Sequence, residues 1–276
     1  MDKVAIISDI HGNYTALKAA IENIEKRGIK KIFCLGDMLV KCSEPKECVS
    51  TILEKCEVVL QGNCERRVVI DPLIKEHFWN RDALSKEQID KIKKLPFSYD
   101  FYMSGYKIRL MHASPNSVHE KAKYWDFDEN FEDRFTHMFD NTEYLNNIGE
   151  EEPDIVVFGH IHKHFLYRIK NKMIINPGSI SNSSELLTVN DDKICYGSYL
   201  IIEGELNSKD ISEITYKFVK FTYDYIKEAN NILNSDMPNK EEAYEEIYSG
   251  KYFNRKRLNE EARKNGKNSN NIWYSW

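Results

Sequence analysis

The sequence lacks the long apolar run that a membrane-spanning helix requires. None of its apolar stretches approaches the roughly 18 residues of such a helix. It also lacks the basic segment and cleavage-site pattern of a secretion signal, because Met1, Asp2 and Lys3 lead directly into a short apolar segment. These absences predict a cytoplasmic protein that has no membrane partner.

Closely paired cysteines are missing as well. The chain has 6 cysteines, and no two of them have the CxxC spacing that is typical of zinc-binding and redox sites. Without a secretion signal, a disulfide framework is not expected either. The cysteines are therefore predicted to be reduced thiols, and a cysteine-bound zinc ion is not favoured.

Positive charge is scarce over most of the chain. The formal net charge is -5, although residues 251–276 carry seven Lys or Arg against two Glu. The remaining main body is strongly acidic, which argues against nucleic-acid binding and against a nuclease. The basic tail, with Trp273, Tyr274 and Trp276, could contact phosphates or a partner, or form a solvated helix and a frayed end.

Short apolar runs alternate with helix signals in the first 60 residues. Buried strands are predicted at 4–7, 32–35 and 58–60. Between them, one helix is predicted to begin near Asn13 and another at Pro45. Strands and helices that alternate at this spacing indicate parallel βαβ units.

The rest of the chain has mixed patterns. The sequence predicts a capped helix over 85–94, a hairpin of 99–103 with 107–111, and a helix over 128–147. A strand at 155–158 and antiparallel strands over about 164–220 follow. Residues 1–221 are expected to form the main domain, and 222–276 a helical extension that packs on it or trails from it.

Polar side chains suited to metal binding follow several strands, at the point where each strand ends. They stand in the motifs Asp-Ile-His, Gly-Asp, Gly-Asn, a single histidine, and Gly-His-Ile-His. Ligand sites in open α/β sheets form at the carboxyl ends of strands, so these side chains are expected to gather in one place. The candidates are Asp9, His11, Asp37, Asn63, His112, His160 and His162.

The chemistry of this set fits metal ions. Two carboxylates, four imidazoles and one amide oxygen suit Mn²⁺ first, with Fe, Zn²⁺ or Mg²⁺ as alternatives. Seven ligands are too many for one ion with an open position, but they suit two divalent ions that share a carboxylate. The resulting charge of about +2 attracts phosphate and lowers the pKa of a bridging water toward neutrality.

The same motifs, in this order, resemble the signature of the calcineurin-like metallophosphoesterases. The resemblance covers about Val4 to Ile180 and includes the Asn-Pro-Gly-Ser segment at 176–179. It implies an α/β fold, a four-layer αββα sandwich of two mixed β-sheets, here with a helical C-terminal extension. It also implies a metal-dependent phosphohydrolase.

The resemblance further implies a role for each residue by position. One ion would be held by Asp9, His11 and His162, and the other by Asn63, His112 and His160. Asp37 would bridge the ions, and a bridging hydroxide would be the nucleophile. Asp37, Asn63 and His112 are therefore the predicted catalytic residues.

The sequence departs from the family pattern after Asn63. Many members have a histidine there, which protonates the leaving group, whereas this chain has Cys64 followed by Glu65. Cys64 is interpreted as a small, half-buried side chain rather than as a thiol acid. Because expulsion of an alkoxide needs a proton, phosphoanhydrides or phosphodiesters of nucleotide type are the predicted substrates.

Other branches of the superfamily remain as alternatives. The loop after Asp37 lacks the Asp-Arg-Gly element of the phosphoprotein phosphatases, so the chain looks closer to the bacterial diadenosine-tetraphosphatase-like and small phosphodiesterase branch. A Ser/Thr phosphatase, a nuclease and a non-catalytic interaction scaffold are less favoured alternatives. A scaffold that had lost its metals would show gaps among the seven residues, and there are none.

Weaker candidates could contact the substrate. Arg66 is suited to hydrogen-bond a phosphate, and Arg67 shares this interpretation, although both could equally begin an exposed helix. His164 lies two residues beyond the last motif, and Asn13 either contacts phosphate or caps a helix. The substrate candidates are thus Asn13, Cys64, Arg66 and His164, whereas His77, His119 and His137 are interpreted as surface or packing residues.

Overall fold

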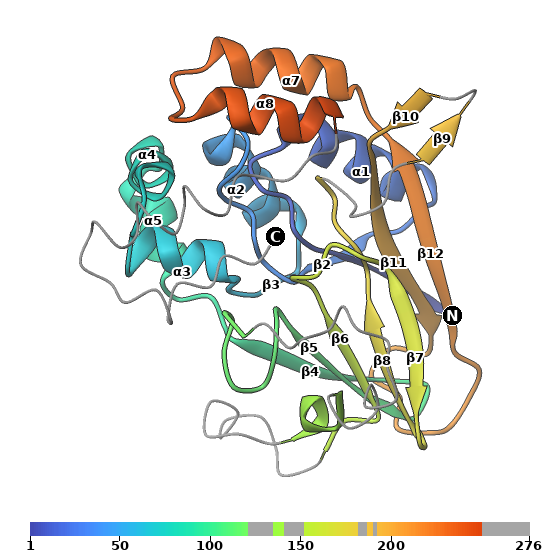
Figure 1. Cartoon of the computed structure of the whole chain (residues 1–276). Helices are drawn as coiled ribbons and strands as arrows, with labels where there is room; N and C mark the ends of the chain where they lie inside the picture. Colours follow the sequence, from blue (N-terminus) through green and yellow to red (C-terminus); the bar gives the residue numbers. More distant parts are fainter. Residues whose placement is uncertain (121–134, 141–151, 182–186, 190–191, 250–276) are drawn as a thin grey trace.

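Two five-stranded β-sheets form the centre of the computed structural model (Figure 1). The structure describes residues 1–120, 135–140, 152–181, 187–189 and 192–249. Both sheets are mixed, and seven α-helices accompany them in these residues. This architecture confirms the predicted α/β fold with two mixed sheets.

The first sheet has the order β12-β11-β1-β2-β3. Strands β1, β2 and β3 pair in parallel, as the predicted βαβ units require, and β11 lies antiparallel to β1. Helices α1 and α2 connect the parallel strands. The bounds are β1 (Asp2–Ile7), α1 (Tyr14–Lys26), β2 (Lys31–Cys34), α2 (Pro45–Lys55), β3 (Val58–Val59), β11 (Tyr196–Gly204) and β12 (Thr215–Thr222).

The second sheet has the order β4-β5-β6-β8-β7. It contains the predicted hairpin, β4 with β5, and the predicted strand β6, which pairs in parallel with both β5 and β8. A separate two-stranded sheet pairs β9 with β10. The bounds are β4 (Ser98–Met103), β5 (Tyr106–Met111), β6 (Ile155–Phe158), β7 (Phe165–Ile169), β8 (Lys172–Asn176), β9 (Leu187–Val189) and β10 (Asp192–Ile194).

Alternating side chains of the strands supply the separate layers of the core. In β1, Ala5 and Ile7 belong to the apolar cluster under the helices, whereas Val4 and Ile6 belong to the cluster between the two sheets. A strand buried on both faces needs apolar residues at every position, which explains why β1 is a continuous apolar run. The outer face of the second sheet has a third cluster, to which Phe158 contributes.

Two helices follow β3 before the predicted helix at 85–94. The chain forms α3 (Asn63–Val69), which contains Arg66 and Arg67 and so agrees with the interpretation of these residues as the start of a helix. The unpredicted helix α4 (Lys75–Ala83) precedes the predicted one, which is observed as α5 (Lys86–Ile92). Helix α4 has few apolar residues, and the side chains that it buries are those of Glu76, His77 and Asn80. Its core-facing side is therefore polar, and hydrophobic periodicity could not detect it.

The predicted helix at 128–147 lies mostly outside the described residues. Within 135–140, the structure has a short 3₁₀ helix, η1 (His137–Phe139), whose Met138 and Phe139 pack on the outer face of the second sheet. The predicted antiparallel strands after His164 are present, but they are divided between the two large sheets and the small one.

The last two described helices are α7 (Tyr225–Asn234) and α8 (Lys240–Ser249). They lie side by side beyond α1 and α2 (Figure 1) and share one apolar cluster with them, to which Ile232 and Ile247 belong. Among the described residues, no helix combines the length and apolar character needed to cross a membrane.

Candidate metal centre

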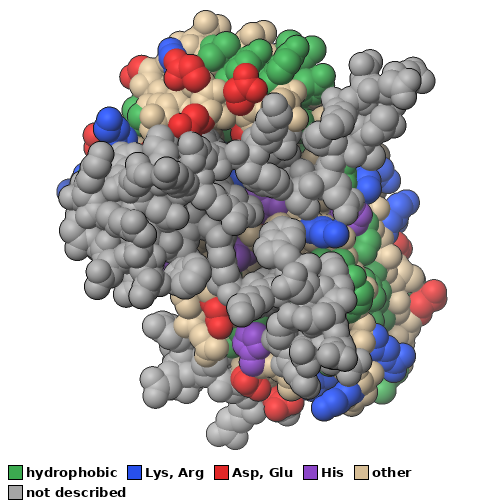
Figure 2. All heavy atoms as spheres, viewed as in Figure 1, with side chains coloured by type: hydrophobic (Ala, Val, Ile, Leu, Met, Phe, Trp, Pro, Cys, Tyr) green, Lys and Arg blue, Asp and Glu red, His purple; other side chains and the backbone are tan. Residues whose placement is uncertain are grey.

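The seven candidate residues come from loops at the carboxyl ends of five strands, β1, β2, β3, β5 and β6. All seven are almost completely buried, with side chains that face one another across the edge of the two sheets. Histidine side chains are visible near the middle of the molecular face in Figure 2. The structure therefore brings the predicted residues together from five separate loops.

The loops interlock through backbone hydrogen bonds. The backbone N–H groups of Ile10 and His11 both donate to the carbonyl of Asp37, at 2.8 and 2.9 Å. Gly36 permits this close packing, because a Cβ atom there would lie 2.5 Å from the Gly62 nitrogen and its φ is +104°. Only glycine tolerates that combination, so the Gly-Asp motif is required by the backbone as well as by its carboxylate.

Backbone strain is concentrated at the same loops. Most non-glycine residues with positive φ in the described residues lie here, although side chains disfavour that conformation. Such strain is commonly found at functional sites, where surrounding contacts maintain it. The positions are Asp9 (φ 57°), His11 (54°), Asp37 (55°), Val40 (71°), Lys41 (74°), His160 (69°) and His162 (61°).

One group of possible metal ligands is formed by Asp9, His11 and His162. The Nε2 atoms of His11 and His162 are 2.9 Å apart, and His162 Nε2 is 3.3 Å from Asp9 Oδ1. His11 Nδ1 donates to the carbonyl of Leu39 (3.2 Å), so its Nε2 atom is directed toward the group.

A second group is formed by Asn63, His112 and His160. Asn63 Oδ1 lies 2.9 Å from both His112 Nε2 and His160 Nδ1. His112 Nδ1 donates to the carbonyl of Leu35 (3.0 Å), which orients its ring as Leu39 orients that of His11.

Asp37 lies between the two groups. Its Oδ2 atom is 3.9 Å from His11 Nε2, and its Oδ1 atom is 3.4 Å from His112 Nε2. Each carboxylate oxygen therefore faces a different group, an arrangement that suits one carboxylate shared by two ions.

The donor atoms have the spacing of ligands around an ion. Nitrogen and oxygen ligands that bind an ion at about 2.0–2.2 Å are separated from one another by roughly 3–4 Å. The measured separations within the two groups run from 2.9 to 3.9 Å. The donor set is thus both chemically and geometrically suited to divalent cations.

Burial and neighbouring charges determine the protonation of the groups. Burial, assisted by Lys41 and His162, lowers the pKa of His11 to about 3, so this imidazole is neutral and able to bind a metal. Burial lowers the pKa of His112, but the negative charge of Asp37 outweighs this effect and raises the pKa of His112 to about 9. Burial raises the pKa of the Asp37 carboxyl, but the nearby imidazoles of His112 and His11 hold it well below its ordinary value.

Glu65 is a structural residue of the centre that the sequence analysis did not identify. Its carboxylate accepts hydrogen bonds from the backbone N–H groups of Asp37 (2.7 Å), Met38 (2.7 Å) and Gly62 (2.8 Å). It therefore joins the loop after β2 to the loop after β3. The sequence shows that Glu65 directly follows the Gly-Asn-Cys segment, but it does not show that the Glu65 carboxylate is fully buried.

The side chains of Asn13 and Cys64 have partners inside the protein. Asn13 Oδ1 caps α1 by accepting from Ala16 N (2.9 Å), and its amide group donates to Ser181 (3.3 Å) and Tyr223 (3.2 Å). This occupancy favours the capping interpretation over phosphate contact. The Cys64 thiol donates to Asp37 Oδ2 (3.3 Å), and the side chain is buried rather than half-buried.

The remaining substrate candidates differ in their exposure. Both arginines lie in α3, as the helix interpretation requires. Arg66 is exposed, whereas Arg67 is buried and pairs with Asp71. His164 packs its ring against Phe218, with a centroid separation of 5.4 Å. Arg66 is therefore the exposed candidate, whereas His164 is half-buried, and both stay candidates for substrate contact.

His119, interpreted as a surface or packing residue, is subject to the charges of Asp37 and His112 of the centre. Its side chain is half-buried, and among the described residues neither ring nitrogen has a hydrogen-bond partner. Burial and then the charges of Arg67 and Arg66 lower the pKa of His119 to about 3, although the charge of Asp37 acts to raise it. His119 is thus a neutral imidazole within electrostatic reach of the centre and of Arg66.

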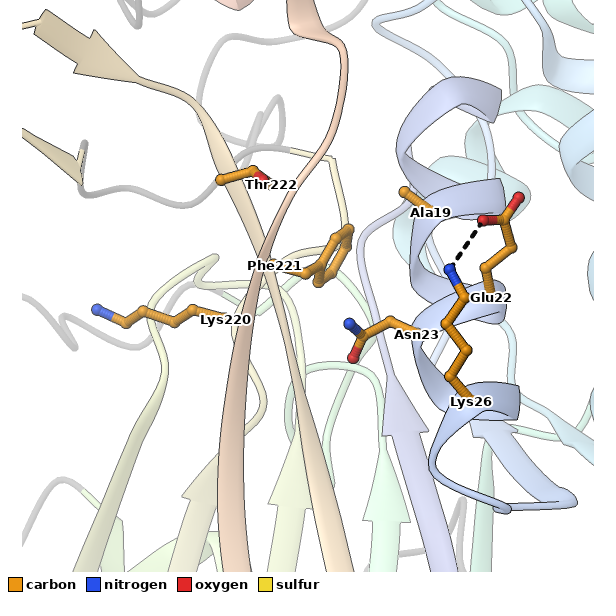
Figure 3. A pocket seen from close by; sticks show the side chains of 7 residues that line it. All are labelled: Ala19, Glu22, Asn23, Lys26, Lys220, Phe221 and Thr222. Atoms are coloured by element: carbon orange, nitrogen blue, oxygen red, sulfur yellow. Dashed lines mark ion pairs between the residues drawn. The ribbon is translucent and has the colours of Figure 1, made fainter. Parts of the chain in front are cut away.

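A surface pocket between α1 and β12 is separate from these residues. Figure 3 shows Glu22, Asn23 and Lys26 of α1 opposite Phe221 of β12, with Glu22 and Lys26 paired at 3.7 Å. None of the seven candidate residues lines it. The pocket therefore has no part in the chemistry of the centre.

The fold and the buried donor atoms define an α/β sandwich with a candidate metal centre at the strand ends. The sequence profile of the calcineurin-like phosphoesterase superfamily domain matches residues 2–192. The chain belongs to this superfamily and is a metal-dependent phosphohydrolase.

Similar proteins are found in other organisms. An uncharacterized protein of Methanocaldococcus jannaschii, MJ0912, is 28% identical over 247 residues, which are 85% of this chain and 93% of that protein. The hypothetical protein PH1004 from Pyrococcus horikoshii has a similar fold, with a TM-score of 0.69 and 16% identity over 92% of this chain and 100% of that one. A metallophosphoesterase from Sphaerobacter thermophilus has a TM-score of 0.62 and 18% identity over 90% and 100%.

Proposed function

We propose that the chain hydrolyses phosphodiesters or phosphoanhydrides of nucleotide type, a class that includes dinucleoside polyphosphates. Asp9, His11 and His162 hold one divalent ion, and Asn63, His112 and His160 hold the other. Asp37 joins the two sets. The observation that carries the proposal is the position of Asp37, with each carboxylate oxygen facing a different group at 3.4 and 3.9 Å.

The bound ions would supply Lewis acidity and an activated water molecule. The side chains of the protein have the complementary task of holding the donor atoms in place. The carbonyls of Leu39 and Leu35 keep Nδ1 of His11 and His112 protonated, so that Nε2 is the atom directed at an ion. At His112, an ion would take the place of the Nε2 proton that Asp37 stabilises. The ligand types suit Mn²⁺ first, with Fe, Zn²⁺ or Mg²⁺ as alternatives.

The Cys64 thiol supports the preference for good leaving groups. Burial, and then the negative charge of Asp37, raise the pKa of this thiol well above its ordinary value. Its S–H group also donates to Asp37 Oδ2 at 3.3 Å. Cys64 is therefore a poor proton donor, and bonds whose leaving groups are stable as anions should react fastest.

A substrate screen with the Mn²⁺-loaded protein tests this function. It compares dinucleoside polyphosphates, cyclic nucleotides, aryl phosphodiesters, phosphopeptides and alkyl monoesters. Aryl esters of graded leaving-group acidity are expected to give rates that fall steeply as the pKa of the leaving group rises. A flat dependence that extends to alkyl monoesters, or a preference for phosphopeptides, would contradict the proposal.

A further inference from the structure

A buried ion pair connects the C-terminal helices to the loop after β2. Lys41 Nζ lies 2.8 Å from Glu246 Oε1 of α8, and the two side chains are 4% and 2% exposed. They are 205 positions apart in the sequence. Two buried charges require each other, because either one alone would lack compensation in the protein interior.

The loop that contains Lys41 has an unfavourable backbone. Val40 and Lys41 are consecutive residues with φ values of 71° and 74°, and a β-branched residue such as Val40 is a marked outlier there. The N–H group of Val40 donates to Asn80 Oδ1 (3.0 Å), and that of Cys42 donates to the His11 carbonyl (2.9 Å). Because strain of this kind persists only where contacts maintain it, the loop depends on its external partners.

The strained loop orients a residue of the centre. Leu39, directly before Val40, presents its carbonyl to His11 Nδ1 at 3.2 Å. Loss of such a contact leaves the ring of a metal-binding histidine free to rotate or to change tautomer. The path from Glu246 to His11 thus passes through Lys41 and the backbone of residues 39–41.

We propose that Lys41 and Glu246 are positioning residues, which hold the loop after β2 so that His11 presents Nε2 to the metal. The helix pair α7–α8 is in this way part of the metal centre, although none of its residues binds an ion. The inference rests on the metal centre proposed above, and it extends that proposal to the C-terminal helices.

The charge of Lys41 makes the proposal testable. Lys41 lies between Leu39 and Cys42, which both hydrogen-bond His11, so its positive charge should repel a cation at that position. Considered as a charge alone, Lys41 should weaken metal binding, and its removal should strengthen it. A positioning role requires the opposite result.

The test measures Mn²⁺ affinity and stoichiometry by calorimetry, together with the melting temperature of the metal-free full chain. Lys41→Met and Glu246→Gln are each expected to lower the affinity for one of the two ions by about 10–100-fold, the range for residues that orient metal ligands. The double variant Lys41→Met/Glu246→Met removes both buried charges. It should recover much of the melting temperature, but not the affinity.

Asp100→Asn is the matched control, because Asp100 forms an ion pair with the buried Arg109 (2.8 Å) in the β4–β5 hairpin. It should lower the melting temperature and leave Mn²⁺ affinity unchanged. Wild-type affinity in Lys41→Met or in the double variant would overturn the proposal, as would equal weakening in Asp100→Asn. A wild-type chain that binds no divalent ion would refute the metal centre itself.

Discussion

Asp37 is the residue on which the chemistry of the centre depends most. It is nearly fully buried, its backbone carbonyl receives two N–H groups of the first loop, and its carboxylate faces both groups of donor atoms. The backbone N–H of Cys64 also donates to Oδ1 at 2.8 Å. A change at this position therefore affects both ions of the proposed pair.

The variant Asp37→Asn tests the shared role. It preserves the side-chain volume but removes the negative charge that two cations need between them. Metal content and turnover are expected to fall together, turnover by more than about 100-fold, because even indirect metal contacts contribute 10–100-fold. Metal analysis and steady-state kinetics of the same samples measure both. Wild-type turnover at normal metal content would contradict the bridging assignment.

Glu228 of α7 has an unusual protonation that affects stability. Its side chain is fully buried, and this burial raises the pKa of Glu228 to about 7. The charge of Glu44 raises the pKa further, whereas Thr15 and Lys18 act to lower it. A carboxyl whose pKa is raised on folding contributes stability that is fully present below pH 4.5 and is lost as the pH rises through 7. The wild type therefore carries a penalty at alkaline pH that is absent at acid pH.

The variant Glu228→Gln removes this penalty. Relative to the wild type, its free energy of unfolding should increase by about 2–3 kcal/mol between pH 4.5 and 8, from 1.36 kcal/mol per pKa unit. Urea unfolding of both proteins at each pH measures the difference, in which other titrating groups cancel. A difference that does not change with pH would show that Glu228 ionises normally in the folded protein.

At the scale of elements, the loops after β1, β2 and β3 act as one unit. Backbone hydrogen bonds connect the first loop to the second, and Glu65 connects the second to the third. The sequence predicted these strands from their apolar runs, and the parallel order followed from the alternation with helices. It could not predict α4, whose buried side includes Glu76 and Asn80, because polar residues are buried there only by virtue of tertiary contacts.

Gly36→Ala tests the packing of these loops. A Cβ atom at Gly36 would meet the Gly62 backbone at 2.5 Å, so the variant should lose more than about 3 kcal/mol or fail to fold. Gly28→Ala is the control, since Gly28 also has positive φ (72°) but no atom within 4 Å of the added Cβ. It should lose about 1–2 kcal/mol. Equal losses in chemical unfolding would contradict the packing argument.

At the scale of the molecule, one apolar cluster extends from the first sheet through α1 and α2 to α7 and α8. This continuity, together with the Lys41–Glu246 ion pair, leads us to propose that residues 222–249 unfold with the main domain. The sequence analysis had left open whether the extension packs on that domain. Its position depends on contacts between residues about 200 positions apart, which a local pattern cannot reveal.

Removal of metal tests the molecule as a whole. Ions at 100 times their dissociation constant stabilise the folded state by about 2.7 kcal/mol. This value applies to each ion, so for a chain of this size EDTA should lower the melting temperature by about 10–20 °C when it removes both. Calorimetry is expected to show a single transition with and without metal. A separate transition for the C-terminal helices would contradict a common folding unit, and an unchanged melting temperature would argue against tight metal binding.

Local sequence patterns were sufficient to predict the parallel βαβ units and to identify the seven candidate residues, because strand periodicity and short motifs are local properties. Three contacts became visible only in the folded chain: Asp37 faces both groups, the Cys64 thiol donates to Asp37, and Glu246 pairs with Lys41. These are contacts between separate elements, set by packing and burial. A local pattern specifies which side chains are present, whereas only the folded chain specifies which of their atoms meet.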